Sequence, residues 1–531
     1  MKKNLALFLS VIFILSVVVS MPAVASADEA PATIVIGCGF DVMGLDPAHA
    51  YEYYCNMVMY ALYDNLLQVQ PGSDEPVPCL ATSYDIADDN VTYTFHLRDD
   101  VVFATGNKLT SADVKWCIER THYMMTTTSM HTDGIESMEC PDDTTLVIKL
   151  SAPDSSFLTK LTVNTFAVMD STVLAENGGL NTEDAATADT AESYINEHMD
   201  LGSGPFLVES FNPGVEIVLK RNENYWGDKP AANRVIIKAV GDANSALMML
   251  ESGDLDVALN MTADQLPQIS MSDAVTYEMV PTATITYLLM NQNSEYGGPM
   301  TNPDVRKAVG YALNYANIQA MAGEGSFTPW SMVQSTFVGY KGERDTSYTD
   351  IEKAKELLAQ AGYPDGFDVE LEVGDYEAGG TKLTDLAQLI ASDLSKVGIN
   401  AKINIETSAV AVDRYVAGVQ GFALWLWTPD YYDLNNQLAF SPNGKCGALA
   451  SWTVETEEDQ ALYDLCQQII SELDPEARAA ESAQFQDALA DGSPFWCLCQ
   501  HPRIVAFGTG VSGVNSSDVY HIYLPTLAKK F

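Results

Sequence analysis

The chain has 531 residues, of which 47% are apolar and 19% are charged, so it has room for roughly two or three domains with large cores and is not an intrinsically disordered protein. Its 28 basic and 72 acidic residues give a formal net charge of −44 at pH 7. Such an acidic surface repels nucleic acid and anionic lipid, so we expect no nucleic-acid partner, and it favours solubility, cationic ligands or a salt-rich environment.

The N-terminus has the layout of a secretory signal peptide. Lys2 and Lys3 precede an apolar run over residues 5–19, and small residues that suit cleavage follow it. No later segment reaches the roughly 18 uninterrupted apolar residues of a transmembrane helix. We therefore expect residues 1–27 to be removed and the mature protein to lie in the periplasm or at the cell surface. The residues before Cys38 do not form a convincing lipobox, so a lipid anchor is not predicted.

Nine cysteines are scattered along the chain without a C-x-x-C pair, so the spacing of a zinc site is absent. Export permits disulfides, but a large α/β protein with its own core does not need them, and the odd number leaves at least one thiol unpaired. We expect free buried cysteines, no metal site and no cofactor. Cys497 and Cys499 would point to the same side of a strand, which leaves a soft-metal or redox role as an alternative.

The segment 78–121 joins a turn, an alternating strand and a capped helix, and nothing in it looks catalytic. Its strand directs alternate side chains to one face, and Thr110 or Ser111 can cap the helix that follows. The alternating residues are Val91, Tyr93, Phe95 and Leu97. Further along, Gly253 ends a predicted helix before a strand over residues 255–259.

The second half of the chain has the pattern of another α/β lobe. Asn302 caps a predicted helix that has Pro303 at its first position. Thr349 and Glu352 form a capping box for a further helix, which ends at Gly362.

Strands and helices then alternate between residues 367 and 427. The predicted strands cover residues 367–373, 401–405 and 422–426, and the predicted helices cover residues 383–397 and 410–417. This alternation favours parallel pairing with right-handed crossovers, and ligands of such sheets bind beyond the carboxyl ends of the strands. Two loops are therefore candidates for ligand contact, residues 374–377 and residues 427–431.

Several runs in this order resemble family 5 extracellular solute-binding proteins, the oligopeptide, dipeptide and nickel receptors of ABC importers. These runs are PCLATSYD, TYTFHLRDD, SGPF, NENYWG and KAKELLAQAGYPDGF. The resemblance implies an α/β, two-lobed periplasmic-binding-protein-like fold (type II, cluster C) with an extra first-lobe subdomain. The expected divisions are residues 31–58, 168–278 and 505–531 for the main part of the first lobe, 59–167 for the extra subdomain and 279–504 for the second lobe.

The run WTPDYYD corresponds to a family segment whose first aspartate pairs with the α-ammonium group of a peptide ligand, and this role would fall on Asp430. Independently, a carboxylate at a strand end, shielded by aromatic rings, forms a charge-assisted bond to an ammonium group. Trp427 and Tyr431 are its aromatic neighbours, and we expect Trp427 at the cleft and Trp425 in the core. The alternative is that Asp430 only caps a loop or a helix.

Tyr51 and Tyr53 follow an early L-D-P turn, where relatives contact ligand from the first lobe. Relatives that bind dipeptides place an arginine for the ligand carboxylate in the first strand-end loop of the second lobe. Here that loop contains the acids Asp375 and Glu377 on either side of Tyr376, and the next arginine is Arg414. This departure favours a cationic or amine-bearing ligand, although exposed acids are also expected in so acidic a chain.

The resemblance implies an extracytoplasmic receptor that binds oligopeptides or peptide-like amines, closes its lobes over them and delivers them to the permease subunits of an ABC importer. We expect a monomer, and not an enzyme, because G-x-S-x-G, H-E-x-x-H and P-loop patterns are absent. A nickel chelate or a sugar is an alternative ligand, but no histidine falls between residues 367 and 436, and only His49 lies beside a proposed cleft segment. The alternatives from other classes are a secreted hydrolase and a sensory receptor.

Overall fold

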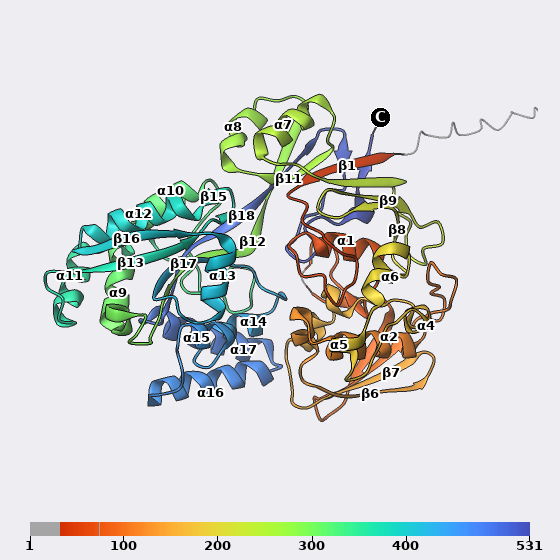
Figure 1. The fold of residues 1–531 in the computed structure, drawn as a ribbon, viewed down its shortest axis with the longest axis horizontal. Helices are drawn as coiled ribbons and strands as arrows, with labels where there is room; N and C mark the ends of the chain where they lie inside the picture. Colours follow the sequence, from red (N-terminus) through yellow and green to blue (C-terminus); the bar gives the residue numbers. More distant parts are fainter. Residues whose placement is uncertain (1–31, 74, 531) are drawn as a thin grey trace, which may run out of the picture.

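A ten-stranded mixed sheet runs through both halves of the molecule in the computed structural model, which describes residues 32–73 and 75–530 (Figure 1). The predicted signal peptide lies outside the described residues. The strand order is β16-β13-β17-β12-β18-β11-β1-β10-β9-β8. The strands are β1 (Thr33–Cys38), β8 (Phe206–Asn212), β9 (Glu216–Arg221), β10 (Arg234–Ala239), β11 (Val257–Met261), β12 (Val275–Met290), β13 (Phe367–Gly374), β16 (Ile399–Glu406), β17 (Phe422–Trp427) and β18 (Phe495–Gly508).

Two long antiparallel strands, β12 and β18, join the two lobes. One end of β18 pairs with β11 of the first lobe, and the opposite end of β12 pairs with β17 of the second lobe. The pairing between β12 and β18 shifts register between Pro281 and Ile285. Two crossing strands with an irregularity between the lobes are suited to hinge motion.

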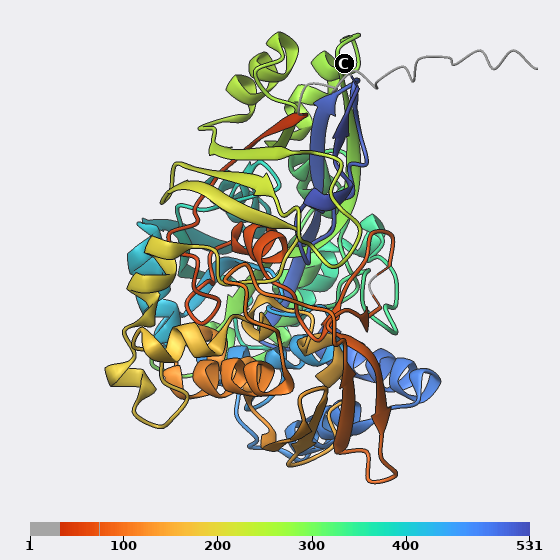
Figure 2. The ribbon, with the colours of Figure 1, turned by 90° about the vertical axis from the view of Figure 1, so that its right-hand side faces the viewer.

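The first lobe also contains a four-stranded antiparallel sheet at the end of the molecule away from β1 (Figures 1 and 2). Its strands, in sheet order, are β4 (Ala81–Ile86), β5 (Thr92–Leu97), β7 (Thr145–Leu150) and β6 (Ile135–Asp142). The predicted alternation is confirmed in β5, where Tyr93, Phe95 and Leu97 are buried. Helix α2 (Ser111–Met124) packs on β6, and Thr110 and Asp113 form its capping box.

A buried arginine connects α2 to the early L-D-P turn. Arg120 is 1% exposed and donates to both carboxylate oxygens of Asp46, at 2.8 and 2.7 Å, and to Asp189 at 2.8 Å. Because a buried guanidinium group is costly unless it is fully paired, these contacts hold the turn before Tyr51 against the subdomain.

The second lobe confirms the alternating order of strands and helices. Strand β13 pairs in parallel with β16 and β17. The main helices are α9 (Pro303–Ala312), α10 (Tyr315–Ala322), α11 (Ile351–Gln360), α12 (Leu383–Ser395), α13 (Ser408–Val416), α16 (Glu457–Ser471) and α17 (Pro475–Ala490). Asn302 caps α9 as predicted, and Gly253 ends α7 (Ala243–Ser252) with a φ of 80°.

The predicted cap of α11 is wrong by one residue. Asp350, not Thr349, is its N-cap, because the Asp350 carboxylate accepts a hydrogen bond from Lys353 N at 2.9 Å. The Thr349 hydroxyl donates instead to the carbonyl oxygen of Leu313 at 2.6 Å.

The cysteines are all free, and all except the half-buried Cys140 are buried. Within residues 32–73 and 75–530, no helix is long and apolar enough to cross a membrane.

Candidate functional site

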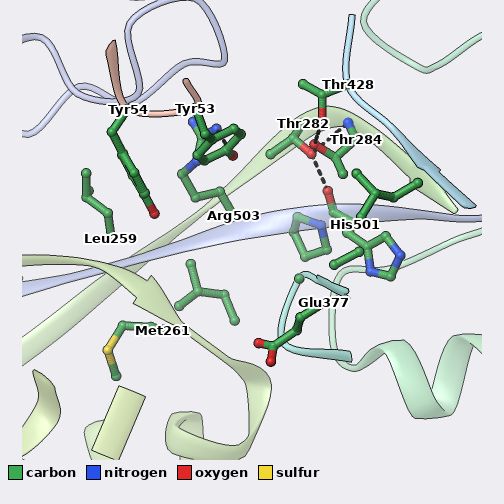
Figure 3. A pocket seen from close by; sticks show the side chains of 15 residues that line it. Tyr53, Tyr54, Leu259, Met261, Thr282, Thr284, Glu377, Thr428, His501 and Arg503 are labelled. Atoms are coloured by element: carbon green, nitrogen blue, oxygen red, sulfur yellow. Dashed lines mark hydrogen bonds between the residues drawn. The ribbon is translucent and has the colours of Figure 1, made fainter. Parts of the chain in front are cut away.

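Two adjoining cavities lie between the lobes. The first has a volume of about 320 Å³ and contains Asp430 in its wall, and we name it the Asp430 cavity. The second, the Glu377 cavity, has a volume of about 280 Å³ and includes Thr282 and Thr284, at the irregular part of β12 (Figure 3). The residues that line both are Tyr53, Leu426 and Thr428. The cavities are therefore neighbouring parts of one interlobe space.

Asp430 follows β17 and lies at a contact between the lobes. Its side chain is 9% exposed, and its Oδ1 accepts a hydrogen bond from the Tyr51 hydroxyl of the first lobe. Lys445 Nζ lies 3.7 Å from Oδ2. Asp430 is not the cap of the helix that follows, because the N-cap of α14 (Leu434–Gln437) is Asp433. Asp430 thus presents a carboxylate to the space between the lobes.

The predicted first-lobe tyrosines both line the Asp430 cavity. Burial and the neighbouring Asp430 carboxylate raise the pKa of Tyr51, so its hydroxyl stays protonated and donates. The Tyr53 hydroxyl accepts a hydrogen bond from Arg503 Nη2 at 2.9 Å, and its ring lies 4.4 Å from that of His521. The local chain after the L-D-P turn therefore brings both rings to the cleft.

The predicted aromatic neighbours of Asp430, Trp427 and Tyr431, are not among the residues that line the cavities. Trp425 is 7% exposed and belongs to the second-lobe core, as expected. Trp427 packs on Phe440, with ring centroids 5.2 Å apart, and lines neither cavity. Tyr431 packs against the first-lobe core and also lines neither cavity.

The loop after β13 contributes Glu377 to the second cavity, and not Asp375 or Tyr376. Asp375 is exposed, and the Tyr376 hydroxyl donates to the carbonyl oxygen of Ser408 at 3.0 Å. Arg414 binds Glu372 and Glu406 and lines neither cavity. The loop therefore supplies the Glu377 carboxylate at a place where binding of a ligand's free carboxylate would require a cationic side chain.

Three histidines that sequence reasoning missed line these cavities. His131 and His521 line the Asp430 cavity, and His501 lines the Glu377 cavity. Burial lowers the pKa of His131 and His501 to about 4, and it lowers that of His521 well below its ordinary value. His49, the expected candidate, lines neither cavity and lies 3.9 Å from Glu192. The described residues contain no group of three or more side chains able to hold a metal ion.

The lobes also touch outside the cavities. Ser155 N of the first lobe donates to the carbonyl oxygen of Ile470 at 2.8 Å, and Asn435 Nδ2 of the second lobe donates to Asp154 Oδ1 at 3.2 Å. Together with the contact between Tyr51 and Asp430, these bonds hold the lobes together around the interlobe space. A ligand held there would contact both lobes.

Comparison with known proteins shows the family. The family model described as bacterial extracellular solute-binding proteins, family 5 middle, matches residues 75–445, which is well over half of the chain. A probable D,D-dipeptide-binding periplasmic protein of Escherichia coli (strain K12) is 26% identical over 491 residues, which is 90% of each chain. Heme-binding protein A of Haemophilus influenzae is 26% identical over 426 residues, covering 75% of this chain and 74% of the relative.

Solved structures show the same fold. The substrate-binding protein CtaP of Listeria monocytogenes superposes with a TM-score of 0.80 at 18% identity, covering 94% of this chain and 100% of the other. The periplasmic binding protein DppA of Helicobacter pylori, in complex with the peptide STSA, gives a TM-score of 0.75 at 24% identity, covering 93% and 98%. The two-lobed architecture is therefore that of periplasmic binding proteins.

Proposed function

The chain belongs to family 5 of the bacterial extracellular solute-binding proteins, the receptors of ABC importers, and we propose that it captures peptides or peptide-like amines between its lobes. In this proposal the mature protein acts outside the cytoplasm, and the lobes close over the ligand. The closed form then delivers the ligand to the permease subunits of an ABC importer. No reaction takes place on the receptor.

The position of Asp430 between the lobes supports this proposal most strongly. Its carboxylate is almost buried, it belongs to the second lobe, and its hydrogen-bond partner Tyr51 belongs to the first. An ammonium group at this point would donate a charge-assisted hydrogen bond to a carboxylate that little water reaches. Because the same ligand would touch Tyr51, its binding would favour the closed arrangement of the lobes.

The side chains that line the cavities, and not the shared fold, determine which chemical class of ligand binds. Family members and similar structures are named for binding D,D-dipeptides, heme, glutathione or a nickel-histidine complex. One scaffold thus serves unrelated solutes, and the side chains between the lobes select among them.

Thermal unfolding across a panel of peptides, polyamines, sugars and nickel chelates tests the ligand class. A ligand present at 100 times its dissociation constant stabilises the folded protein by about 2.7 kcal/mol, a readily measured shift. We expect stabilisation by amine-bearing compounds. Stabilisation by sugars or nickel chelates alone would contradict the proposal, and chemical conversion of the bound compound would indicate an enzyme.

Replacement of Asp430 tests the residue that binds the amine. We expect Asp430→Asn to weaken binding of an amine ligand by about tenfold to 100-fold, because the variant loses a charged hydrogen-bond acceptor. The matched control is Asp413→Asn, which removes the same charge from an exposed position on α13 of the same lobe. Titration calorimetry measures both affinities, and equal affinity of the Asp430 variant and the wild type would remove Asp430 from the binding site.

A further inference from the structure

The charged side chains that line the two interlobe cavities are mostly carboxylates. Glu52, Asp430 and Asp518 line the Asp430 cavity, and Glu377 lines the Glu377 cavity. Among the described lining residues, Arg503 is the one permanent cation. A ligand with a free carboxylate would therefore depend on Arg503, because Lys445 lines neither cavity and already lies 3.7 Å from Asp430 Oδ2.

The terminal N–H groups of Arg503 are already in use. Nη1 donates to the carbonyl oxygen of Ser517 at 2.8 Å and to Ser516 Oγ at 3.5 Å. Nη2 donates to the Tyr53 hydroxyl and to Asp518 Oδ1, both at 2.9 Å. Each of these nitrogens carries two N–H groups, so all four terminal donors have partners. The Asp518 carboxylate also neutralises the Arg503 charge, which leaves little attraction for a ligand carboxylate.

Buried imidazoles add acceptors to the same walls. His131 is 4% exposed, and His501 and His521 are each 2% exposed. Each ring keeps one nitrogen without a hydrogen-bond partner among the described residues, Nε2 in His131 and Nδ1 in the other two. A buried ring nitrogen without a partner is unusual in a folded protein, and a ligand donor would satisfy it.

The protonation state of two of these rings follows from their contacts. His521 Nε2 meets the carbonyl oxygen of Tyr53, which only accepts, so Nε2 carries the proton and Nδ1 has a lone pair. His501 Nε2 lies 3.3 Å from Thr286 Oγ1, which itself donates to the carbonyl oxygen of Cys499 at 3.5 Å, so the same assignment holds. The lowered pKa of His501 keeps this ring neutral at pH 7. Both rings therefore offer acceptors to N–H donors.

The backbone at His521 supports a binding role. Its φ is 58°, in the left-handed region that residues other than glycine seldom adopt, although asparagine, aspartate and histidine adopt it more often than the rest. Such conformations cost free energy and concentrate at ligand-binding sites, where the surrounding contacts hold them. The contacts here are the bond to the Tyr53 carbonyl and the tilted packing of the His521 ring against the Tyr53 ring.

Apolar walls accompany the carboxylate in the second cavity. Leu259 and Met261 of β11 line it together with Glu377, and Figure 3 shows Glu377 and Tyr53 approaching from opposite sides in that view. Methylene groups pack well on such side chains, and a carboxylate nearby attracts a cation at the end of a methylene chain. The walls therefore match an alkylammonium or alkylguanidinium group.

We propose that the receptor selects a ligand with two cationic groups, the second at the end of a short methylene chain, and without a free carboxylate. One cation binds at Asp430 and the second binds at Glu377. The chain between the two cations passes from one cavity to the other beside Tyr53, Leu426 and Thr428, which line both. Polyamines and C-terminally amidated peptides with a basic side chain both have this chemistry. The inference rests on the proposed function, because it uses the same interlobe space and the same Asp430 carboxylate. It adds a second cation on the ligand and excludes ligands that carry a free carboxylate.

Four probes in titration calorimetry test the inference on the full mature chain. They are spermidine, the dipeptide amide Ala-Lys-NH₂, the same dipeptide as a free acid, and the amide with an acetylated N-terminus. We expect the amide to bind about tenfold tighter than the free acid, because only the acid brings a carboxylate against these walls. Binding of spermidine but not of the amide would identify polyamines as the source of this chemistry.

The variant Glu377→Gln tests the second cation directly. We expect it to weaken binding of spermidine or of the amide by about tenfold. The matched control is Glu370→Gln, an exposed acid on β13 of the same lobe. Thermal unfolding without ligand establishes that both variants fold as the wild type does.

The outcomes separate this inference from the proposed function. If the free acid binds as tightly as the amide, or if Glu377→Gln binds like the wild type, the second-cation inference is wrong while the Asp430 site still stands. If acetylation of the amide leaves its affinity unchanged, the Asp430 assignment fails. If neither spermidine nor the amide binds, the dicationic class itself is excluded.

Discussion

At the scale of single residues, the interlobe space combines side chains that sequence reasoning could and could not identify. Asp430 was predictable because it follows a buried strand inside a recognisable run, and the structure places it in a cavity wall. The loop of Glu377 was predicted, but Asp375 and Tyr376 were chosen as its site residues, because the direction of a side chain in a loop depends on dihedral angles that composition does not specify. His501 was missed because it reaches the cavity from a strand far along the chain.

The buried histidines make stability depend on pH. Burial lowers the folded-state pKa of His501 from its ordinary value of 6.5 to about 4, so the unfolded chain binds the proton more readily between these two values. The stabilising effect of the neutral ring is therefore complete above about pH 6.5 and is lost as the pH falls towards 4.

We expect the wild type to lose up to about 3 kcal/mol of unfolding free energy relative to His501→Gln between pH 7 and pH 4.5. Urea unfolding of both proteins at several pH values measures this difference. The comparison with the variant removes the contributions of other titrating groups. A difference that stays constant with pH would show that His501 is not held neutral by the fold.

At the scale of elements, capping and periodicity predicted most helices and strands, because those signals act within a few residues. The error at the start of α11 arose where two adjacent residues, Thr349 and Asp350, could both cap the helix. Close packing between elements is different, since it depends on distant partners. Gly310 of α9 illustrates this, because a Cβ there would lie 2.0 Å from Cζ2 of the buried Trp496 of β18.

We expect Gly310→Ala to destabilise the protein by about 1–3 kcal/mol, because the added methyl group would force the Trp496 ring or the helix to move. This loss opposes the higher helix propensity of alanine, which alone would favour the variant by about 1 kcal/mol. The control is Gly241→Ala, where an added Cβ meets nothing within 4 Å. Urea midpoints measure both effects, and a Gly310 variant as stable as the wild type would contradict the close contact.

At the scale of the whole molecule, the family pattern predicted two lobes, and the structure shows how they are joined. Strands β12 and β18 cross between the lobes, and the irregular part of β12 borders the Glu377 cavity. The cavities themselves could not be predicted, because their walls come from segments near residues 52, 131, 377, 430, 501 and 521. Only the folded chain brings these segments together.

The most direct test of the account is the position of the bound ligand. A crystal structure of the complex with the amine compound that stabilises the protein most should show that compound between the lobes. We predict its amine nitrogen at about 2.7–3.2 Å from a carboxylate oxygen of Asp430. Electron density for the compound on the outer surface, with nothing bound between the lobes, would contradict the account.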